Sequence, residues 1–428
     1  MTKSDAAGWF RSYPVPMASR AEYDVAIVGA SLAGCTAAIL LGQAGARVAL
    51  IEKSPDPQAY KRVCSHLIQA SAVPTIERLG LYEPILEAGG VRSRLHSWTR
   101  WGWVEPTEER HAYCLNLRRS LLDPMLKEKA AAQAGVELML GRRAVGLVRD
   151  GEAFGGVVVR DREGNERVIG ARLTVGADGR DSHLAEMAQV KDKTLPHARL
   201  AYGGYFEGPK PRFWPDGAIW LLDPDMAAAF PTDGGLVFYI AMVNKDRAPE
   251  FREDAERALV EHVAAVPEAP PIRESRLVEP VTGKVEMPNR IRGPVAPGLA
   301  LVGDAALATD PLFGVGCGFA IQSGEWLADS VSPALRGIES LENGLRRYRK
   351  RHRRQLGMHA RLIHEYATER KFDPIERLMI STAVRDRKAA ALFEALGTRR
   401  KTPPQLLAPM AARIVAANVR RPLRSARS

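Results

Sequence analysis

Three short segments, far apart in a chain of 428 residues, carry residue types that could bind a nucleotide-containing ligand. The first is glycine-rich and spans residues 25–34, the second spans residues 176–182, and the third joins residues 301–304 to the turn 311–316. Glycine-rich turns let backbone N–H groups approach phosphate oxygens, and carboxylates at strand ends accept hydrogen bonds from sugar hydroxyls. The chemistry indicated is the binding of a large phosphorylated cofactor.

The first segment follows an apolar run and opens a stretch with a helical pattern; its residues are Gly29, Ala30, Ser31, Leu32, Ala33 and Gly34. We expect a strand, a tight turn and a helix whose N-terminus offers unpaired N–H groups to a pyrophosphate. Ser31 replaces the second glycine of the usual pattern and is small enough to keep the loop open.

Glu52 ends the next predicted strand, where a carboxylate can accept hydrogen bonds from the adenosine ribose hydroxyls. Its neighbour Lys53 is included in the expected site. The alternative is a chance glycine-rich turn in an α/β protein, and the placement of Glu52 counts against it.

The third segment separates FAD from a nicotinamide cofactor bound alone. Asp304 follows Gly303 at the end of an apolar strand, where a carboxylate can bind a hydroxylated chain such as ribitol. A turn then leads into a predicted helix, and we expect its residues Pro311, Gly314, Val315 and Gly316 to contact the cofactor. N–H groups there can stabilise the N1/O2 edge of a reduced isoalloxazine. The alternative is a turn with an aspartate cap.

Together the three segments resemble the FAD-dependent aromatic hydroxylase superfamily of the p-hydroxybenzoate hydroxylase type. Its relatives include epoxidases, flavin halogenases and geranylgeranyl reductases. The resemblance covers roughly residues 23–330 at the level of motifs, and it places Asp178 in the Asp-Gly motif of the family. It is more specific for fold and cofactor than for the reaction.

The resemblance also implies basic residues near the cofactor. Arg119 begins a segment similar to the family's Arg-x-x-Leu-Asp helix start, where the arginine contacts FAD, and Arg118 is a competing candidate. Lys61-Arg62 follows the second strand, where the family often places a basic residue, and we include Arg62 in the site. A surface charge is the alternative for each.

The resemblance implies that NAD(P)H reduces the flavin, directly or through a partner reductase. The reaction expected first is monooxygenation, a hydroxylation or epoxidation through a flavin C4a-hydroperoxide, on an aromatic or polyketide-like small molecule. The alternatives are a geranylgeranyl-reductase-like reductase or dehydrogenase of a lipophilic chain, then a flavin-dependent halogenase, and a flavin-binding protein without turnover. No catalytic residue is identified, and four histidines are interpreted as structural or surface residues: His66, His96, His111 and His183.

A tryptophan-rich segment, residues 101–106, superficially resembles the Trp-x-Trp-x-Ile-Pro signature of flavin halogenases. Glu105 stands in place of the isoleucine, and the segment precedes the Asp-Gly motif instead of following it. We therefore interpret Trp98, Trp101 and Trp103 as one face of a strand in the pocket wall or core.

The elements that must position these residues form an α/β fold. We expect a Rossmann-like FAD-binding domain (GR2-type), interrupted by a β-sheet substrate domain and followed by a helical C-terminal region. The expected boundaries are 20–190 and 291–335 for the FAD-binding domain, 191–290 for the β-rich domain, and 336–428 for the helical region with its basic tail. Strands are predicted at 25–28, 47–51, 136–140 and 298–302, helices at 32–43, 121–134 and 319–330, and an antiparallel meander over 145–175.

In the β-rich segment we predict one helix, at about 250–265. Its aromatic residues either line a substrate pocket or fill the sheet core; they are Phe206, Phe213, Trp214, Trp220, Phe230, Phe238 and Tyr239. After residue 340 we predict helices, with breaks at Asp373-Pro374 and Pro403-Pro404.

The formal net charge of +11 is uneven: residues 346–354 form one dense basic run, and no Asp or Glu occurs from Gly397 onward. The sequence contains no recognisable nucleic-acid-binding module. We therefore interpret the basic run as a solvated helix face and the C-terminal residues as a basic tail. The alternatives are an anionic substrate, a carrier protein, or peripheral contact with a membrane surface.

No stretch approaches the roughly 20 apolar residues of a membrane helix, and the first twenty residues lack the apolar core of a secretory signal. Four cysteines show no metal-ligand spacing. We therefore expect no metal site, reduced thiols and a cytoplasmic location.

Overall fold

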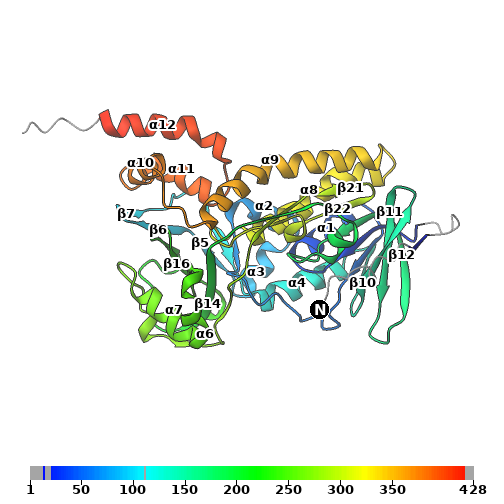
Figure 1. Cartoon of the computed structure of the whole chain (residues 1–428), viewed down its shortest axis with the longest axis horizontal. Coiled ribbons are helices and arrows are strands. Elements are labelled where there is room, and N and C mark those ends of the chain that lie inside the picture. Colours follow the sequence, from blue (N-terminus) through cyan, green and yellow to red (C-terminus); the bar gives the residue numbers. More distant parts are fainter. Residues whose placement is uncertain (1–12, 15–20, 110–111, 420–428) are drawn as a thin grey trace, which may run out of the picture.

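The computed structural model describes residues 13–14, 21–109 and 112–419. Two large β-sheets form its two halves, and the C-terminal helices lie along one side of both (Figure 1). His111 and the tail from residue 420, like the first twelve residues, lie outside the described residues.

The first sheet has nine strands and contains the parallel core of the predicted FAD-binding domain. Its parallel strands follow the order β9 (Val136–Met139), β3 (Val48–Ile51), β2 (Tyr23–Val28), β12 (Glu166–Gly176) and β22 (Leu299–Leu301). The strands β2, β3 and β22 are almost entirely buried, as parallel strands covered on both faces must be. The predicted βαβ start and the late return of a strand are confirmed.

Helix α1 (Leu32–Gln43) has the predicted bounds. It is buried from Leu32 to Gly42, because it packs between the sheet, α4 (Arg119–Ala131) and α8 (Gly316–Leu335). A helix that is apolar on all sides can exist only in such a position.

The antiparallel meander is also confirmed. It is formed by β10 (Arg143–Asp150), β11 (Ala153–Arg160) and the first half of β12, whose second half then joins the parallel strands. Two short strands extend this sheet: β1 (Tyr13–Pro14) pairs with β10, and β21 (Val295–Ala296) pairs with β22.

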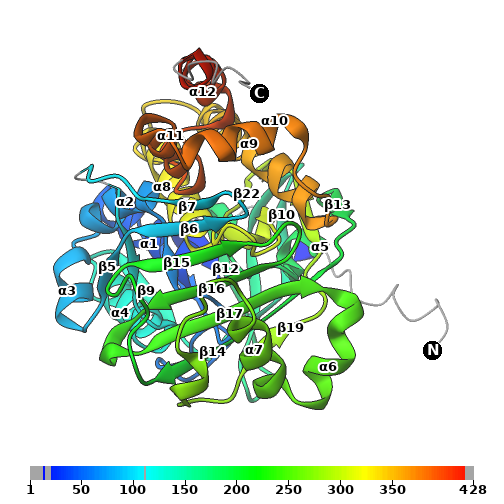
Figure 2. The same ribbon diagram turned by 90° about the vertical axis from the view of Figure 1, so that its left-hand side faces the viewer.

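The second large sheet has eight strands, of which six come from the β-rich segment predicted at 191–290 and two from the range predicted for the FAD-binding domain (Figure 2). Its order is β18 (Arg276–Leu277), β14 (Arg199–Glu207), β17 (Val237–Asn244), β16 (Met226–Pro231), β15 (Gly217–Leu221), β6 (Leu95–Thr99) and β7 (Gly102–Val104), with β19 (Thr282–Lys284) also on β14. The hairpin β6–β7 comes from early in the chain and joins through a parallel pairing of β6 with β15.

Smaller elements connect the two halves. Two three-stranded sheets have the orders β4 (Leu67–Ile68), β8 (Cys114–Asn116), β5 (Val91–Ser93), and β13 (Asp192–Leu195), β20 (Asn289–Arg292), β23 (Leu307–Ala308). The short helices here are α2 (Val73–Arg78), α3 (Tyr82–Glu87) and α5 (His183–Met187).

The single helix predicted at about 250–265 is in fact two, α6 (Ala248–Glu253) and α7 (Ala255–Ala264). Asp254 separates them because its backbone is extended, with φ −152°, and its side chain accepts a hydrogen bond from the Arg257 N–H. An aspartate in that position ends one helix and caps the next.

The aromatic residues of the second sheet divide between its two faces. The core that packs against α6 and α7 contains Phe206, Trp220 and Tyr239, with Phe213 and Trp214 at its edge. Phe230 and Phe238 lie on the other face, which looks toward the turn before α8. Most of this set therefore fills the core, as alternation along strands requires.

The tryptophans near residue 100 do not form one face of a single strand as predicted. Trp98 and Trp103 are directly opposite each other in the β6–β7 hairpin, and both pack on the core beside α7. Trp101 occupies the intervening turn, where the Arg100 guanidinium lies 5.6 Å from its ring centroid. Because the chain turns between Trp98 and Trp103, the alternation along a single strand does not predict which of these side chains share a face.

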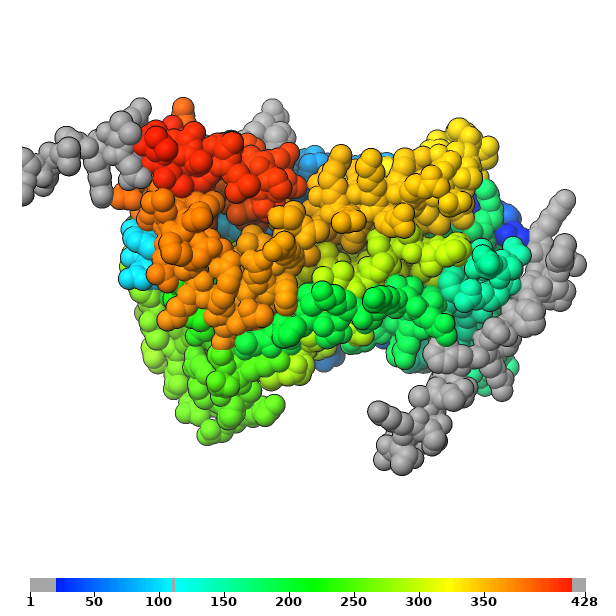
Figure 3. All heavy atoms as spheres, turned by 45° about the horizontal axis from the view of Figure 1, so that its top comes forward, coloured from blue at the N-terminus to red at the C-terminus, as the bar shows by residue number. Residues whose placement is uncertain are grey.

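The C-terminal region consists of α9 (Leu341–Ala367), α10 (Pro374–Ala383), α11 (Arg387–Gly397) and α12 (Pro403–Val419). The predicted breaks are confirmed: Asp373 forms a capping box at the start of α10, and α12 begins at Pro403. These helices cover one face in orange and red (Figure 3). No helix of the described residues is long and apolar enough to cross a membrane.

The basic run 346–354 lies on α9. Leu345, Tyr348 and His352 point inward and are buried, whereas the basic side chains between them are mostly exposed. Several of these arginines form ion pairs, such as Arg347 with Glu339 and Arg351 with Asp329. The solvated helix face predicted for this run agrees with this arrangement.

Replacing Tyr348 with phenylalanine tests how α9 is attached to the sheet. The buried Tyr348 hydroxyl donates a hydrogen bond of 2.7 Å to the Leu301 carbonyl at the end of β22. Loss of this bond should lower the free energy of unfolding by about 1 kcal/mol, measured by urea denaturation. Tyr60→Phe, at an exposed position, is the control and should have almost no effect. An unchanged stability of Tyr348→Phe would contradict this role.

Candidate FAD site

Two glycines allow the turn between β2 and α1 to lie against neighbouring backbone. Gly29 has φ +107°, and a Cβ atom added to it would come within 2.4 Å of the Ala177 carbonyl oxygen. A Cβ on Gly34 would come within 1.8 Å of the Gly29 carbonyl oxygen. Any larger residue at either position would displace the backbone, so the predicted roles of both glycines have a steric basis.

The starts of α1 and α8 have no side-chain cap. Ser31 is the N-cap of α1, but its hydroxyl accepts a hydrogen bond from Arg119 Nη2 at 2.7 Å instead of bonding the helix. Val315, the N-cap of α8, has no polar side chain. The helices α2, α3, α4 and α6 also lack a side-chain cap, whereas α5, α7, α9, α10 and α11 are each capped by an Asp or Ser side chain. The N–H groups at the starts of α1 and α8 are thus available to an anionic ligand, and they fit a pyrophosphate and a reduced isoalloxazine.

Glu52 lies beside the start of α1. Its Oε2 accepts a hydrogen bond of 3.0 Å from the Ala30 N–H, and its Oε1 accepts one from Ser54 N–H at 2.9 Å. The carboxylate is therefore fixed next to the predicted pyrophosphate loop, which suits binding of the adenosine ribose. Lys53 is exposed.

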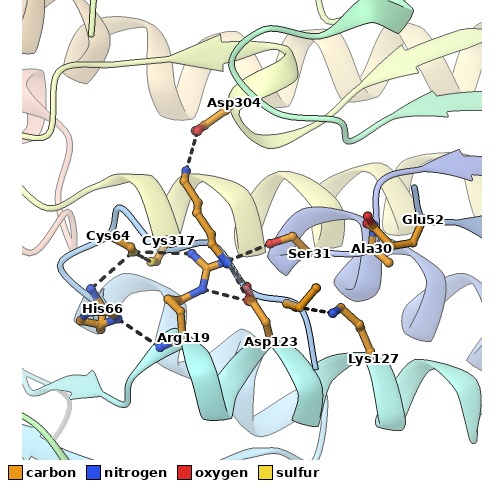
Figure 4. A network of polar contacts seen from close by, with 12 residues as sticks. Ala30, Ser31, Glu52, Cys64, His66, Arg119, Asp123, Lys127, Asp304 and Cys317 are labelled. Atoms are coloured by element: carbon orange, nitrogen blue, oxygen red, sulfur yellow. Dashed lines mark hydrogen bonds and ion pairs between the residues drawn. The ribbon is translucent and has the colours of Figure 1, made fainter. Parts of the chain in front are cut away.

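Asp304 forms an ion pair with Lys61, at 3.0 Å between Oδ2 and Nζ (Figure 4). Burial acts to raise the pKa of Asp304, but Lys61 and Arg180 outweigh it, so its pKa lies below the usual value. The carboxylate is thus ionised and able to accept hydrogen bonds from ribitol hydroxyls. The sequence pointed to Arg62; both side chains are exposed, and Lys61 is the one that forms an ion pair with Asp304.

Arg119, and not its neighbour Arg118, points toward the predicted FAD-binding residues. Its side chain is 2% exposed and binds Asp123 through two nitrogens, at 2.8 and 2.9 Å. The same guanidinium reaches Ser31 (Figure 4). Arg118 points elsewhere and pairs with Asp233. A buried arginine needs such a partner, and Asp123 follows it by one helical turn.

The Asp-Gly motif organises the segment that follows it. Asp178 accepts hydrogen bonds from the Ser182 hydroxyl and from the Leu184 N–H, so its carboxylate orders the start of α5. Arg180 donates to the carbonyls of Pro288 and Thr309, both at 2.6 Å, and so ties the motif to the segment before Pro311.

The turn before α8 is closed by a hydrogen bond of 2.8 Å from the Gly314 N–H to the Pro311 carbonyl. Gly314 has φ +61°, and a Cβ there would come within 2.9 Å of Leu67. Gly316 is exposed and begins the helix. The predicted cofactor residues from Pro311 to Gly316 therefore form one compact turn that leads into an uncapped helix.

Two cysteines that the sequence did not assign to the site lie within it. Cys64 Sγ is 3.5 Å from Cys317 Sγ in the first turn of α8, and 3.5 Å from Arg119 Nη1. The hydrogen bond from Cys317 is the main cause that holds the pKa of the Cys64 thiol well below its usual value, with help from Arg119 against the effect of burial. All four cysteines are free. Their proximity to motif residues is the only signal that could have identified this pair.

The described histidines differ in their surroundings. His66 is buried, accepts a hydrogen bond from the Arg119 N–H, and contacts the Tyr205 hydroxyl; burial lowers its pKa to about 4. His96 stacks on Phe213 with ring centroids 3.8 Å apart, and His183 is exposed. Among the described residues no cluster of three or more His, Cys, Asp or Glu side chains could hold a metal.

We predict that Asp304→Ala weakens FAD binding while leaving the fold intact. A hydrogen bond to a charged group contributes about 1.5–3 kcal/mol, which corresponds to roughly a 10- to 100-fold increase in Kd. Titration of the apoprotein with FAD, followed by flavin fluorescence, measures this. Asp246→Ala, at an exposed position, is the control. Unchanged affinity in Asp304→Ala would remove this carboxylate from the site.

We also predict that Cys64 reacts with iodoacetamide as a thiolate. Because its pKa is lowered, a larger fraction of Cys64 is thiolate at neutral pH than for an ordinary thiol. Its labelling rate should therefore decline at a lower pH than that of an ordinary thiol with pKa about 8.5. Cys114, whose pKa burial raises to about 12, is the internal control. Peptide mass spectrometry reads the label, bound FAD should slow it, and an ordinary pH dependence would contradict the prediction.

Known proteins are similar to this chain in sequence and in fold. The family model described as "FAD binding domain" matches residues 22–360. Digeranylgeranylglycerophospholipid reductase of Methanocaldococcus jannaschii is 27% identical over 345 residues, covering 77% of this chain and 82% of that protein. Squalene epoxidase 2 of Arabidopsis thaliana is 27% identical over 330 residues, covering 74% of this chain and 55% of that protein.

A solved structure, the flavin-dependent brominase Bmp2, superimposes with a TM-score of 0.75 at 20% identity, covering 93% of this chain and 100% of the brominase. That similarity concerns the fold. The family match over most of the chain, the two uncapped helix starts and the placement of Glu52 and Asp304 all agree on the cofactor. This chain belongs to the FAD-binding family of the p-hydroxybenzoate hydroxylase type and is an FAD-dependent oxidoreductase.

Proposed function

We propose that this protein is a monooxygenase that uses FAD and NAD(P)H to hydroxylate or epoxidise a lipophilic aromatic or polyketide-like small molecule. The observation that carries the proposal is a mostly apolar cavity of about 240 Å³ that begins at the turn before α8. Leu312, Phe313 and Val315 of that turn form part of its wall. A molecule in the cavity would therefore lie beside the expected edge of the isoalloxazine.

The C-terminal helices close the cavity from the other side. Leu362 and Tyr366 of α9, Phe393 of α11 and Leu406 of α12 belong to its wall. Closing an apolar site over the substrate excludes water, which would otherwise intercept reactive oxygen-transfer species. Bound FAD would supply the redox chemistry, and the protein would supply orientation and a dry environment.

The cavity is large enough for a compact substrate. An engineered apolar cavity of about 150 Å³ holds one benzene molecule. A cavity of about 240 Å³ is less than twice as large, so it can hold a molecule with one or two rings.

Two titratable side chains on the cavity wall, His359 and Tyr366, are uncharged at neutral pH. Burial, aided by the nearby Arg399, lowers the pKa of His359 to about 4, so its imidazole is neutral at pH 7. Tyr366 donates a hydrogen bond of 2.6 Å to Glu376, and burial together with this bond raises its pKa. These two groups would thus act by hydrogen bonding and shape and not as charged acids or bases.

A second candidate is a reductase of a lipophilic chain. Its support is the apolar wall together with the curated relatives, six of which are digeranylgeranylglycerophospholipid reductases at 24–27% identity. A halogenase ranks third, because its support is similarity of fold and the segment 101–106 departs from the halogenase signature.

The FAD-loaded protein should oxidise NADH or NADPH faster when a suitable naphthol or alkylphenol is added. The product should contain one added oxygen atom, and isotopically labelled dioxygen should be its source, as mass spectrometry can show. Geranylgeraniol serves as the competing probe: a gain of two hydrogen atoms without dioxygen would identify the reductase instead. Absence of flavin absorbance after addition of FAD would contradict both.

A variant that fills the cavity separates substrate binding from cofactor binding. Leu362→Trp should abolish the stimulation by substrate while leaving the Kd for FAD unchanged. Leu121→Trp, at a surface position, is the matched control and should retain the stimulation. Full activity in Leu362→Trp would show that the substrate binds elsewhere.

A further inference from the structure

Arg399, on the cavity wall, lacks a carboxylate partner. Arg399 lies in the connection between α11 and α12 and adopts φ +57°, a backbone conformation that is unusual for a residue with a side chain. Its side chain runs inward to the first turn of α8, where its guanidinium carbon lies 4.5 Å from the Phe319 ring centroid. Gly318 makes room for it, since a Cβ there would come within 2.4 Å of Arg399 Nη2.

The hydrogen bonds of this guanidinium go to neutral amides. Its Nε donates to the Gln69 side-chain oxygen, and its Nη2 donates to that of Gln322 at 2.7 Å. Gln69 in turn donates to the carbonyls of Phe313 and Gly397, at 2.9 and 2.7 Å. This network fixes the guanidinium beside the turn before α8 without neutralising its charge.

No carboxylate of the described residues forms an ion pair with Arg399. Arg199, also on the cavity wall, donates to the backbone carbonyls of Pro224 and Tyr366, whereas two other arginines near Arg399 pair with carboxylates. Arg400, the next residue, pairs with Glu109, and Arg370 on the same cavity wall pairs with Glu376 at 2.6 Å. Burial lowers the pKa of Arg399 to about 9, which leaves it charged at neutral pH. A cation partly removed from water without a counter-charge is costly, and an anionic ligand would offset that cost.

Arg399 forms part of the cavity wall. It lines the cavity together with Leu396 and Val315, and the rest of the nearby surface is mostly apolar. Nη1 has no partner among the described residues of the wall, so at least this nitrogen can donate to a ligand. A charge-assisted hydrogen bond from this nitrogen to an oxygen of a carboxylate or phosphate is stronger than one to a neutral acceptor.

We propose that Arg399 binds the anionic group, a carboxylate or phosphate, of a lipophilic substrate whose apolar body lies against Leu312 and Phe313. This inference rests on the proposed function, because it takes the cavity to be the substrate site. It narrows the substrate class from lipophilic molecules in general to lipophilic anions. Arg399 is then the residue that sets specificity and orients the ring toward the turn before α8.

The test compares three two-ring probes on the FAD-loaded protein: naphthoate, naphthyl phosphate and the neutral isostere naphthamide. Binding is followed by the change in flavin absorbance and by calorimetry, without turnover. We expect the better of the two anions to bind about tenfold or more tightly than the amide, as a charge-assisted pair predicts. Whichever anion binds better identifies carboxylate or phosphate as the group recognised.

Arg399→Gln should remove the preference for the anion while leaving binding of the amide nearly unchanged. Arg399→Lys keeps the charge and should retain part of the preference, which guards against a variant that merely loses structure. Arg354→Gln, on the exposed face of α9, is the control for loss of one positive charge. Thermal stability and the Kd for FAD are measured for each variant.

Several outcomes would overturn the inference. They are equal binding of anion and amide by the original protein, no binding of any probe, an equal loss for all probes in Arg399→Gln, or weakened FAD binding in that variant. Binding of an anion that depends on Arg399 but leads to no oxygenation would refute the proposed function alone. Oxygenation of neutral phenols, together with anionic probes that bind no more tightly than the amide, would refute this inference alone.

Discussion

The close approach of α1 to its neighbours is the constraint on which the cofactor site depends. Gly324 of α8 lies so near that a Cβ there would meet the Ala33 carbonyl oxygen at 2.6 Å, and a Cβ on Gly303 would meet the Ala33 side chain at 2.9 Å. Backbones can approach to this distance only where side chains are absent. As a result, two helices that are separated by most of the chain present their uncapped N-termini to one cradle.

Around the FAD site, how deeply each charged side chain is buried matters as much as how many charged side chains are present. The Arg119–Asp123 pair is nearly inaccessible, and such a pair contributes little net stability because both charges lose hydration. Its value here is positional: the same guanidinium holds Ser31 and lies beside Cys64. The serine that departs from the usual glycine pattern is therefore fixed by a residue far away in sequence. Lys61 and Asp304 show the same principle at the other end, where each keeps the other ionised.

Local patterns were sufficient to predict much of this structure. The bounds of α1, the meander and the breaks before Pro374 and Pro403 depend on turn and helix chemistry within a few residues, so they could be read from the sequence. The choice between Lys61 and Arg62, or between Arg118 and Arg119, could not, because neighbouring side chains point in different directions and only tertiary contacts decide which reaches the site.

Long-range pairing explains the remaining differences. The hairpin β6–β7 joins the second sheet through a parallel pairing with β15, more than a hundred residues later, and no local signal encodes that partner. Likewise, the cavity is assembled from the turn before α8 and from helices near the end of the chain. Arg399 belongs to no recognisable sequence motif, and its place on the cavity wall depends on how α11 and α12 pack.

Helix α9 has a consequence for how this protein can change during evolution. It has 27 residues and is thus about 40 Å long, and it connects the strand end before Gly303 with the cavity wall at Ile363 and Tyr366. One residue inserted between these two ends would rotate the wall residues by about 100° relative to the anchored end. Substitutions along the last turns of α9 would therefore change the lining of the cavity one residue at a time, whereas insertions or deletions within the helix would turn that lining away from the turn before α8.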